Sequence, residues 1–198
     1  VAQIEELGAV EAHAAGPARH RRLGLGRQLE ICHEGDLAAV PGDGGQVPTA
    51  LQFALAADLS AQLHIRHVER PYKTVIGIAP QMYDEIWVGG KVMYKLETTV
   101  ADGGELIIYA PHIDRISRTH GEQLESIGYH VRDYFLSRMD LFTDVPRGII
   151  AHSTHVRGIG TFEDDVERPR ITVTLATGID EAMCRKLKLN YRDHRSLD

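Results

Sequence analysis

One cation directly follows two glycines in the stretch "APQMYDEIWVGGKV", residues 79–92. The stretch is otherwise typical of a helix, and each glycine inside a helix costs about 1 kcal/mol of stability relative to alanine. If the regular helix begins only at Lys91, this lysine lies close to the end of the preceding strand and can bind a carboxylate. Alternatively, Gly89 and Gly90 only allow a tight contact between the helix and the sheet, and Lys91 is a solvated surface charge. Spacing alone favours this second interpretation.

Histidines are the other abundant chemical groups, with eleven in the chain. "HSTH" places His152 and His155 three residues apart, and His112 follows an expected strand. On a helix that spacing would be an ordinary arrangement of metal ligands, but we predict a strand at 147–153, where the two rings do not share a face. We therefore expect hydrogen-bonded loop histidines and assign no metal ligand.

Strands and helices alternate over most of the chain. Apolar runs with β-branched residues predict buried strands at 73–79, 105–110, 147–153 and 170–176. Residues 63–69 are expected to form a short strand or an extended lead-in to the first of these strands. Helical patterns predict helices at 49–63, 84–100, 119–128, 129–139 and 179–189, the last with Asp180 as N-cap. We expect a turn at 101–104 and a charged loop at 161–170. This alternation predicts an α/β fold, a Rossmann-like three-layer domain with a mostly parallel sheet. Ligands of such folds bind beyond the carboxyl ends of the strands.

Composition bounds the organisation of the chain and its partners. Residues 1–50 form a loop-rich segment, with one expected helix at 1–15, and residues 51–198 form the α/β domain. Because the chain begins at Val1, it is expected to be a fragment or a processed piece. The net charge of −6 without a basic stripe argues against nucleic acid, and no apolar run is long enough for a membrane. Two cysteines and no signal peptide indicate the cytoplasm.

A family resemblance covers roughly residues 55–198. The segments "YKTVIGIAPQMYDEIWVGGKVMYKLETTVADGGELIIYAPHI", "THGEQLESIGYHVRDYF" and "AHSTHVRGIGTFEDDVERPRITVTLATGI" resemble the C-terminal domain of the nickel-dependent lactate racemase (LarA-like) family. The resemblance implies a 2-hydroxy acid racemase or epimerase with two α/β domains and an active site in the cleft between them. It implies a nickel pincer nucleotide that accepts and returns a hydride, held by a lysine and a histidine of an N-terminal domain outside this segment.

The resemblance also implies what this domain contributes. The family's C-terminal domain closes over the site and supplies a lysine to the substrate, and Lys91 matches that lysine. We predict Tyr83 and Trp87 as further substrate contacts. The family's glutamine near the lysine falls at Val88, which leaves the substrate class open. Without its N-terminal cofactor domain the chain is expected to be inactive, and its exposed cleft surface would favour homo-oligomers.

Two other classes of function remain as alternatives. One is a stand-alone α/β module that binds small anions without catalysis. The other is a histidine-based metal hydrolase that uses His112, His152 and His155, for which the three rings would have to converge.

Overall fold

The computed structural model describes residues 9–10 and 49–197 of the chain. The chain divides into two compact units. One unit contains residues 1–16 and 69–198, and the other contains residues 17–68. Within the described residues, no helix is both long and apolar enough to cross a membrane.

The unit of residues 17–68 contains helix α1, Thr49–His64. Its alanine- and leucine-rich sequence favours a helix, and the predicted helix at 49–63 is confirmed. The side chains of Phe53, Leu55 and Leu63 are exposed. Of the two alternatives for 63–69, the short strand does not form, because the helix continues through His64 and residues 65–68 belong to no helix or strand.

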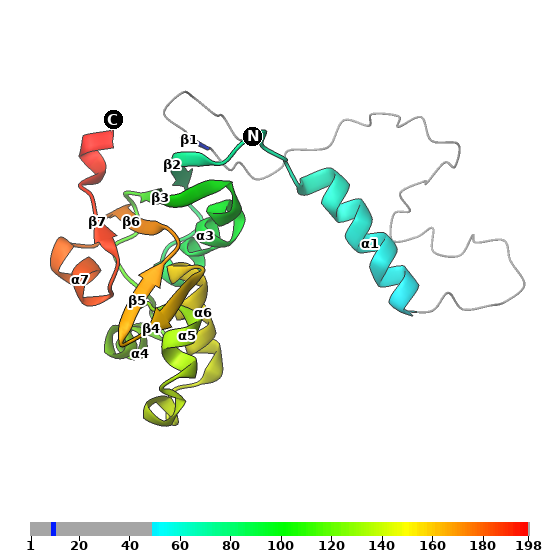
Figure 1. Ribbon diagram of the computed structural model, residues 1–198. Helices are drawn as coiled ribbons and strands as arrows, with labels where there is room; N and C mark the ends of the chain where they lie inside the picture. Colours follow the sequence, from blue (N-terminus) through cyan, green and yellow to red (C-terminus); the bar gives the residue numbers. More distant parts are fainter. Residues whose placement is uncertain (1–8, 11–48, 198) are drawn as a thin grey trace, which may run out of the picture. The chain divides into compact units, whose positions relative to one another are not determined.

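The α/β unit is built around a five-stranded parallel sheet in the order β1-β2-β3-β6-β7 (Figure 1). The strands are β1 (Ala9–Val10), β2 (Tyr72–Ile78), β3 (Val100–Ala110), β6 (Thr172–Thr177) and β7 (Asn190–Tyr191). The prediction of a Rossmann-like α/β fold with a mostly parallel sheet is confirmed. Of the helix predicted at 1–15, only Ala9 and Val10 are described, and they form a strand; the rest lies outside the described residues.

The helices of this unit bury one set of alternating strand residues. Val75, Leu106, Ile108, Val173 and Leu175 form one hydrophobic core with the apolar side chains of the helices. The helices are α2 (Ile86–Gly89), α3 (Lys91–Leu96), α4 (Gly121–Ile127), α5 (Arg132–Leu136), α6 (Arg147–Arg157) and α7 (Glu181–Lys186). Short 3₁₀ helices span Glu97–Thr99, Met139–Phe142 and His194–Leu197.

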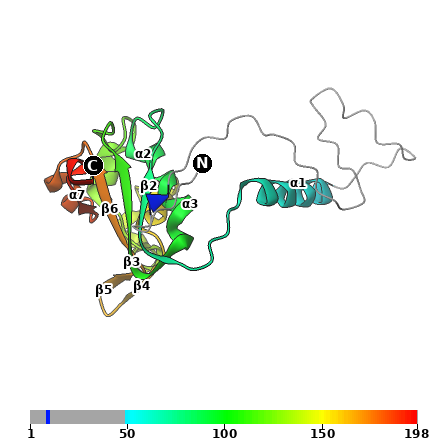
Figure 2. The ribbon, with the colours of Figure 1, turned by 90° about the horizontal axis from the view of Figure 1, so that it is seen from above.

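Helix α3 lies very close to the sheet (Figure 2). A Cβ atom added at Gly77 of β2 would lie 2.2 Å from Val92 Cγ1 and 2.7 Å from Leu96 Cδ1. Only a residue without a side chain fits this contact between strand and helix.

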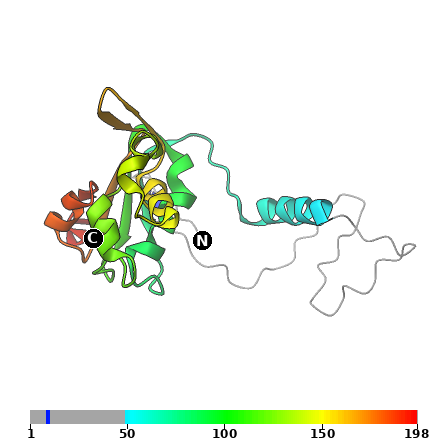
Figure 3. The same cartoon turned by 90° about the horizontal axis from the view of Figure 1, so that it is seen from below.

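Two predicted elements differ in type from the structure. Residues 147–153 are not a strand but the first part of α6, whose buried residues Ile149, Ile150, Ser153 and Val156 follow helical spacing. Residues 161–170 are not a loop: β4 (Gly160–Glu163) and β5 (Val166–Pro169) pair as an antiparallel hairpin. Figure 3 shows this hairpin projecting from the α/β unit.

Smaller corrections concern turns and ends. The turn predicted at 101–104 is part of β3, next to a shift in the pairing register with β2. Helix 84–100 is interrupted at Gly90 and followed by the 3₁₀ turn Glu97–Thr99. The N-cap prediction is confirmed, because the Asp180 carboxylate accepts a hydrogen bond of 2.8 Å from the Met183 N–H.

Candidate functional site at the carboxyl edge of the sheet

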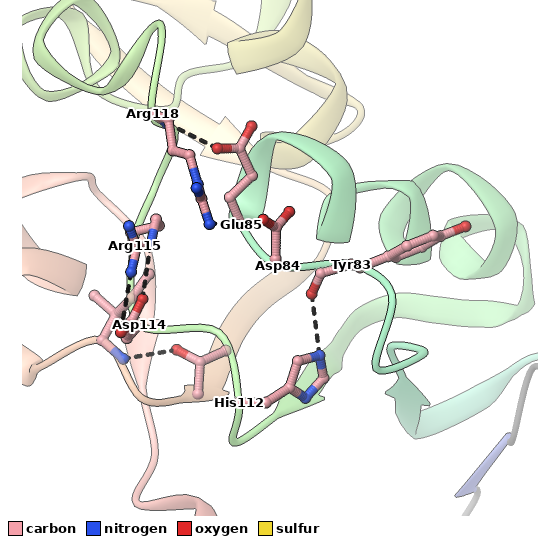
Figure 4. A network of polar contacts seen from close by, with 9 residues as sticks. Tyr83, Asp84, Glu85, His112, Asp114, Arg115 and Arg118 are labelled. Carbon is pink, nitrogen blue, oxygen red and sulfur yellow. Dashed lines mark hydrogen bonds and ion pairs between the residues drawn. The ribbon is translucent and has the colours of Figure 1, made fainter.

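The loops after β2 and β3 meet at the carboxyl edge of the sheet, where parallel α/β folds bind ligands (Figure 4). Their backbones are joined directly. The Ile86 N–H donates to the Arg115 carbonyl at 3.1 Å, and the Trp87 N–H donates to the Ile116 carbonyl at 2.9 Å. The start of α2 is therefore held by the loop that follows β3.

Side chains strengthen the same connection. The Glu85 carboxylate accepts hydrogen bonds from the Arg118 N–H at 2.7 Å and from the Ser117 hydroxyl at 3.3 Å. The Nε2–H of His112 donates to the Tyr83 carbonyl at 3.0 Å, as Figure 4 shows. The buried Nδ1 of His112 has no hydrogen-bond partner among the described residues. Glu85 and His112 thus fix the loop that carries the predicted substrate contacts.

Lys91 is the first residue of α3 and is exposed. Its amine lies 5.6 Å from the centroid of the Tyr83 ring, within the range of a cation–π interaction. Among the described residues no ion pair to Lys91 is found. The structure therefore brings Lys91 and Tyr83 together at this edge, and leaves the lysine charge accessible.

The two glycines before Lys91 are explained by packing. A Cβ atom at Gly89 would lie 2.9 Å from Ile113 Cδ1 in the loop after β3. At Gly90 it would lie 2.6 Å from Val156 Cγ2 and 3.3 Å from His152 Cε1, both on α6. The regular helix restarts at Lys91, as one interpretation of the sequence expects. Close packing also accounts for both glycines, but their neighbours are the loop after β3 and helix α6 and not the sheet.

Gly90→Ala is expected to lower the free energy of unfolding by about 1–3 kcal/mol, because Val156 is β-branched and cannot easily rotate away. Urea denaturation followed by circular dichroism measures this change. Gly148→Ala is the matched control, since a Cβ there meets no atom within 4 Å and the residue lies in α6. In the control, the free energy of unfolding should rise by up to about 1 kcal/mol. If it falls equally in both variants, the packing explanation is contradicted.

Trp87 lies on α2 and packs against two histidines from other elements. Its ring centroid lies 4.6 Å from that of His120, before α4, and 4.3 Å from that of His152, on α6. Trp87 is half-buried and belongs to an aromatic cluster with these two histidines.

His152 is the centre of this cluster. Its side chain is buried, and both ring nitrogens face tyrosine hydroxyls: Tyr94 lies 3.2 Å from Nδ1 and Tyr129 lies 3.3 Å from Nε2. Burial lowers the pKa of His152 to about 4, with smaller contributions from His155 and His120. The ring is therefore neutral at pH 7. Burial also raises the pKa values of Tyr129 and Tyr94, so both hydroxyls keep their protons.

The three histidines considered for a metal hydrolase do not form a metal site. The described residues contain no group of three or more His, Cys, Asp or Glu side chains that could hold a metal ion. His152 and His155 do lie three residues apart on a helix, contrary to the strand prediction. However, His152 uses both nitrogens within the cluster, His155 is exposed, and His112 is bonded to Tyr83.

A shallow cavity lies at the same edge, between the loops after β3 and β6. Its volume is about 270 Å³, and its lining mixes acidic, basic and apolar side chains, among them Asp114, Arg115, Asp180 and Met183. Arg115 is already paired with Asp114 at 2.9 Å. Arg115 is the only lysine or arginine of the cavity lining, so the cavity offers no unpaired cation comparable to Lys91.

No family model matches this chain, and no curated protein matches it. Among solved structures, the chain is similar to a protein from Thermotoga maritima determined by the Northeast Structural Genomics Consortium. The two are 35% identical, with a TM-score of 0.70, over 75% of this chain. The match covers 37% of the Thermotoga protein, so this chain spans a little over a third of its length.

Proposed function

We propose that this chain is the C-terminal, substrate-closing domain of a lactate racemase-like racemase or epimerase of 2-hydroxy acids. The observation that carries the proposal is the exposed amine of Lys91, which begins α3 beside Tyr83 and has no ion-pair partner among the described residues. Its position beyond the β2 strand end suits a small carboxylate ligand. The family resemblance supplies the chemistry that the carboxylate-bearing substrate would undergo.

In this proposal the chain binds and orients the substrate. The Lys91 ammonium pairs with the carboxylate of the 2-hydroxy acid, and the Tyr83 ring next to it provides an apolar wall. The backbone bonds that hold Ile86 and Trp87 to the β3 loop keep this surface in place. Trp87, which packs on His120 and His152, remains a proposed substrate contact.

The nickel pincer nucleotide would supply the acceptance and return of a hydride. The described residues contain no cluster suited to a metal ion, so we assign none of them to this cofactor. The proposal instead places it on a second, N-terminal domain. The match covers only 37% of the Thermotoga protein, so that protein is long enough to contain a further domain.

We also propose the cytoplasm as the compartment. Cys184 is a free, buried thiol, and burial raises its pKa to about 11. Such a thiol is an inert core residue, as expected in a reducing environment. Self-association through the exposed edge is part of the same proposal, and size-exclusion chromatography with light scattering tests it.

Lys91→Ala is expected to weaken lactate binding by about tenfold, or about 1.4 kcal/mol. NMR titration of the 198-residue chain with lactate measures this, through shifts of the amides of Gly89 and Gly90. Lys95→Ala is the matched control, because Lys95 is exposed on the same helix and carries the same charge. The affinity of the Lys95→Ala variant for lactate should differ from that of the wild type by less than twofold.

A neutral analogue completes the experiment. 1,2-Propanediol replaces the carboxylate of lactate by a hydroxymethyl group, and it should bind weakly and equally to the wild type and to Lys91→Ala. Equal lactate affinities of the wild type and Lys91→Ala would overturn the proposal. If lactate binds through Lys91 but a protein completed with its cofactor domain does not interconvert the lactate enantiomers, the stand-alone anion-binding module is the better description.

A further inference from the structure

The His152 side chain contacts several elements around the interruption of the α2–α3 helix. Its ring packs on Trp87 of α2 with a centroid distance of 4.3 Å. Its Nδ1 faces the hydroxyl of Tyr94 on α3, and its Cε1 lies against Gly90 between the two helices. Its Nε2 faces the hydroxyl of Tyr129, in the segment between α4 and α5.

We infer that His152 is a positioning residue, which fixes the angle between α2 and α3 and thereby orients Lys91 at the carboxyl edge of the sheet. The inference rests on the proposed function only for the role of Lys91. A single rigid ring bound at two nitrogens and one face restrains both short helices. Each of them is too short to be stable by itself, with four and six residues.

The hydrogen bonds of this ring require its neutral form. In either neutral tautomer one nitrogen donates to a tyrosine hydroxyl, and the other accepts from the second hydroxyl. The titratable groups facing the ring are Tyr94 of α3, Tyr129 before α5, His120 before α4 and His155 of α6. None of them carries a negative charge at pH 7, so nothing there stabilises an imidazolium ion, in agreement with the lowered pKa of His152.

The sequence provides a specific optical probe for the inference. Trp87 is the only tryptophan of the chain and lies against the rings of His152 and His120, so the indole emission reports on this one cluster. His152→Leu removes both hydrogen bonds but keeps an apolar side chain. His152→Gln keeps one donor and one acceptor.

The experiment compares the two variants with the wild type at pH 7.5. We expect His152→Leu to change the position or intensity of the Trp87 emission and to weaken lactate binding at least fivefold. His152→Gln should recover most of both properties. Thermal unfolding is recorded for each variant, so that the comparison is made between folded proteins. His155 is an exposed histidine on the same helix that packs on Tyr94, and His155→Gln should change the emission and the lactate affinity much less than His152→Leu.

The outcomes separate this inference from the proposed function. Wild-type emission and lactate affinity in a folded His152→Leu protein would overturn the positioning role. If His152→Leu does not fold, Tyr94→Phe decides, because it removes only the hydroxyl that links α3 to His152; unchanged emission and affinity would then overturn it. If the emission changes as expected while Lys91→Ala binds lactate normally, the positioning of α2 stands and the proposed substrate role of Lys91 fails.

Discussion

Glu167→Ala is expected to lower the free energy of unfolding by about 3 kcal/mol, because it leaves buried charges and donors without their partner. Glu167 lies on β5, and its carboxylate accepts a hydrogen bond of 2.6 Å from the Val131 N–H and one of 2.8 Å from His130 Nδ1. Arg157 of α6 lies 3.5 Å from the same carboxylate. These contacts attach the β4–β5 hairpin to the helical layer.

The surroundings of Glu167 explain the size of this effect. Only 16% of its side chain is exposed, and the same is true of Arg157. Burial alone would raise the pKa of Glu167, but the hydrogen bonds from His130 and Val131 and the charge of Arg157 outweigh burial and lower it. The folded protein therefore favours the carboxylate, and its contribution to stability is present above pH 4.5 and lost as the pH falls through the lowered pKa.

Urea denaturation at pH 7 measures the effect, and Glu163→Ala is the matched control. Glu163 lies on the other strand of the hairpin, with 72% of its side chain exposed and its partner Arg168 4.0 Å away. Such exposed pairs contribute little, so this variant should stay within about 0.5 kcal/mol of the wild type. If Glu167→Ala lowers the free energy of unfolding no more than Glu163→Ala does, the contacts of Glu167 contribute no more to stability than an exposed ion pair.

Acidification is expected to destabilise the protein through His152. The unfolded ring has an ordinary pKa of about 6.5, whereas the pKa in the folded protein is about 4. The unfolded state therefore binds more protons between these values, and the free energy of unfolding falls as the pH falls from 6.5 toward 4. Between pH 7 and pH 5 the loss from this residue is about 2 kcal/mol.

Variants at two positions of α6 isolate this contribution. Urea denaturation of the wild type between pH 7 and pH 5 gives the slope of the free energy of unfolding against pH. This range lies above the one in which carboxylates protonate. His152→Gln should remove most of the slope, because glutamine does not titrate. His155→Gln should change it little, since His155 is exposed and only a smaller contributor to the shift of His152. A slope that survives in His152→Gln would assign the pH dependence to other groups.

The parts of the fold that were predictable have strong local signals. The β-branched runs of β2, β3 and β6 identify these strands, and Asp180 identifies the start of α7. Helix α6 was missed because Ile149 and Ile150 favour a strand. Its helical period becomes visible only when the polar residues His152 and Ser153 are counted as buried.

The candidate site was predictable only in part, for a similar reason. Lys91 and Tyr83 are close in the sequence and lie together in the structure. The surroundings of Trp87 depend on residues from distant segments: Tyr94 and His152 are 58 positions apart, and Tyr129 and His152 are 23 apart. Had α6 been assigned as a helix, the spacing of its apolar residues would have indicated that His152 is buried, and His152 would have been a stronger candidate for a contact of the site. Its two tyrosine partners carry no signal in the sequence.

The contact at Gly77 limits how this unit can move during any closure over a ligand. Because Val92 and Leu96 rest directly on the backbone of β2, α3 has no room to tilt toward the sheet or to slide along it without steric overlap. Lys91 must then travel with the sheet as one rigid body. In the proposed function, closure over a carboxylate would then require movement of the whole unit, and not a local swing of the helix that bears the amine.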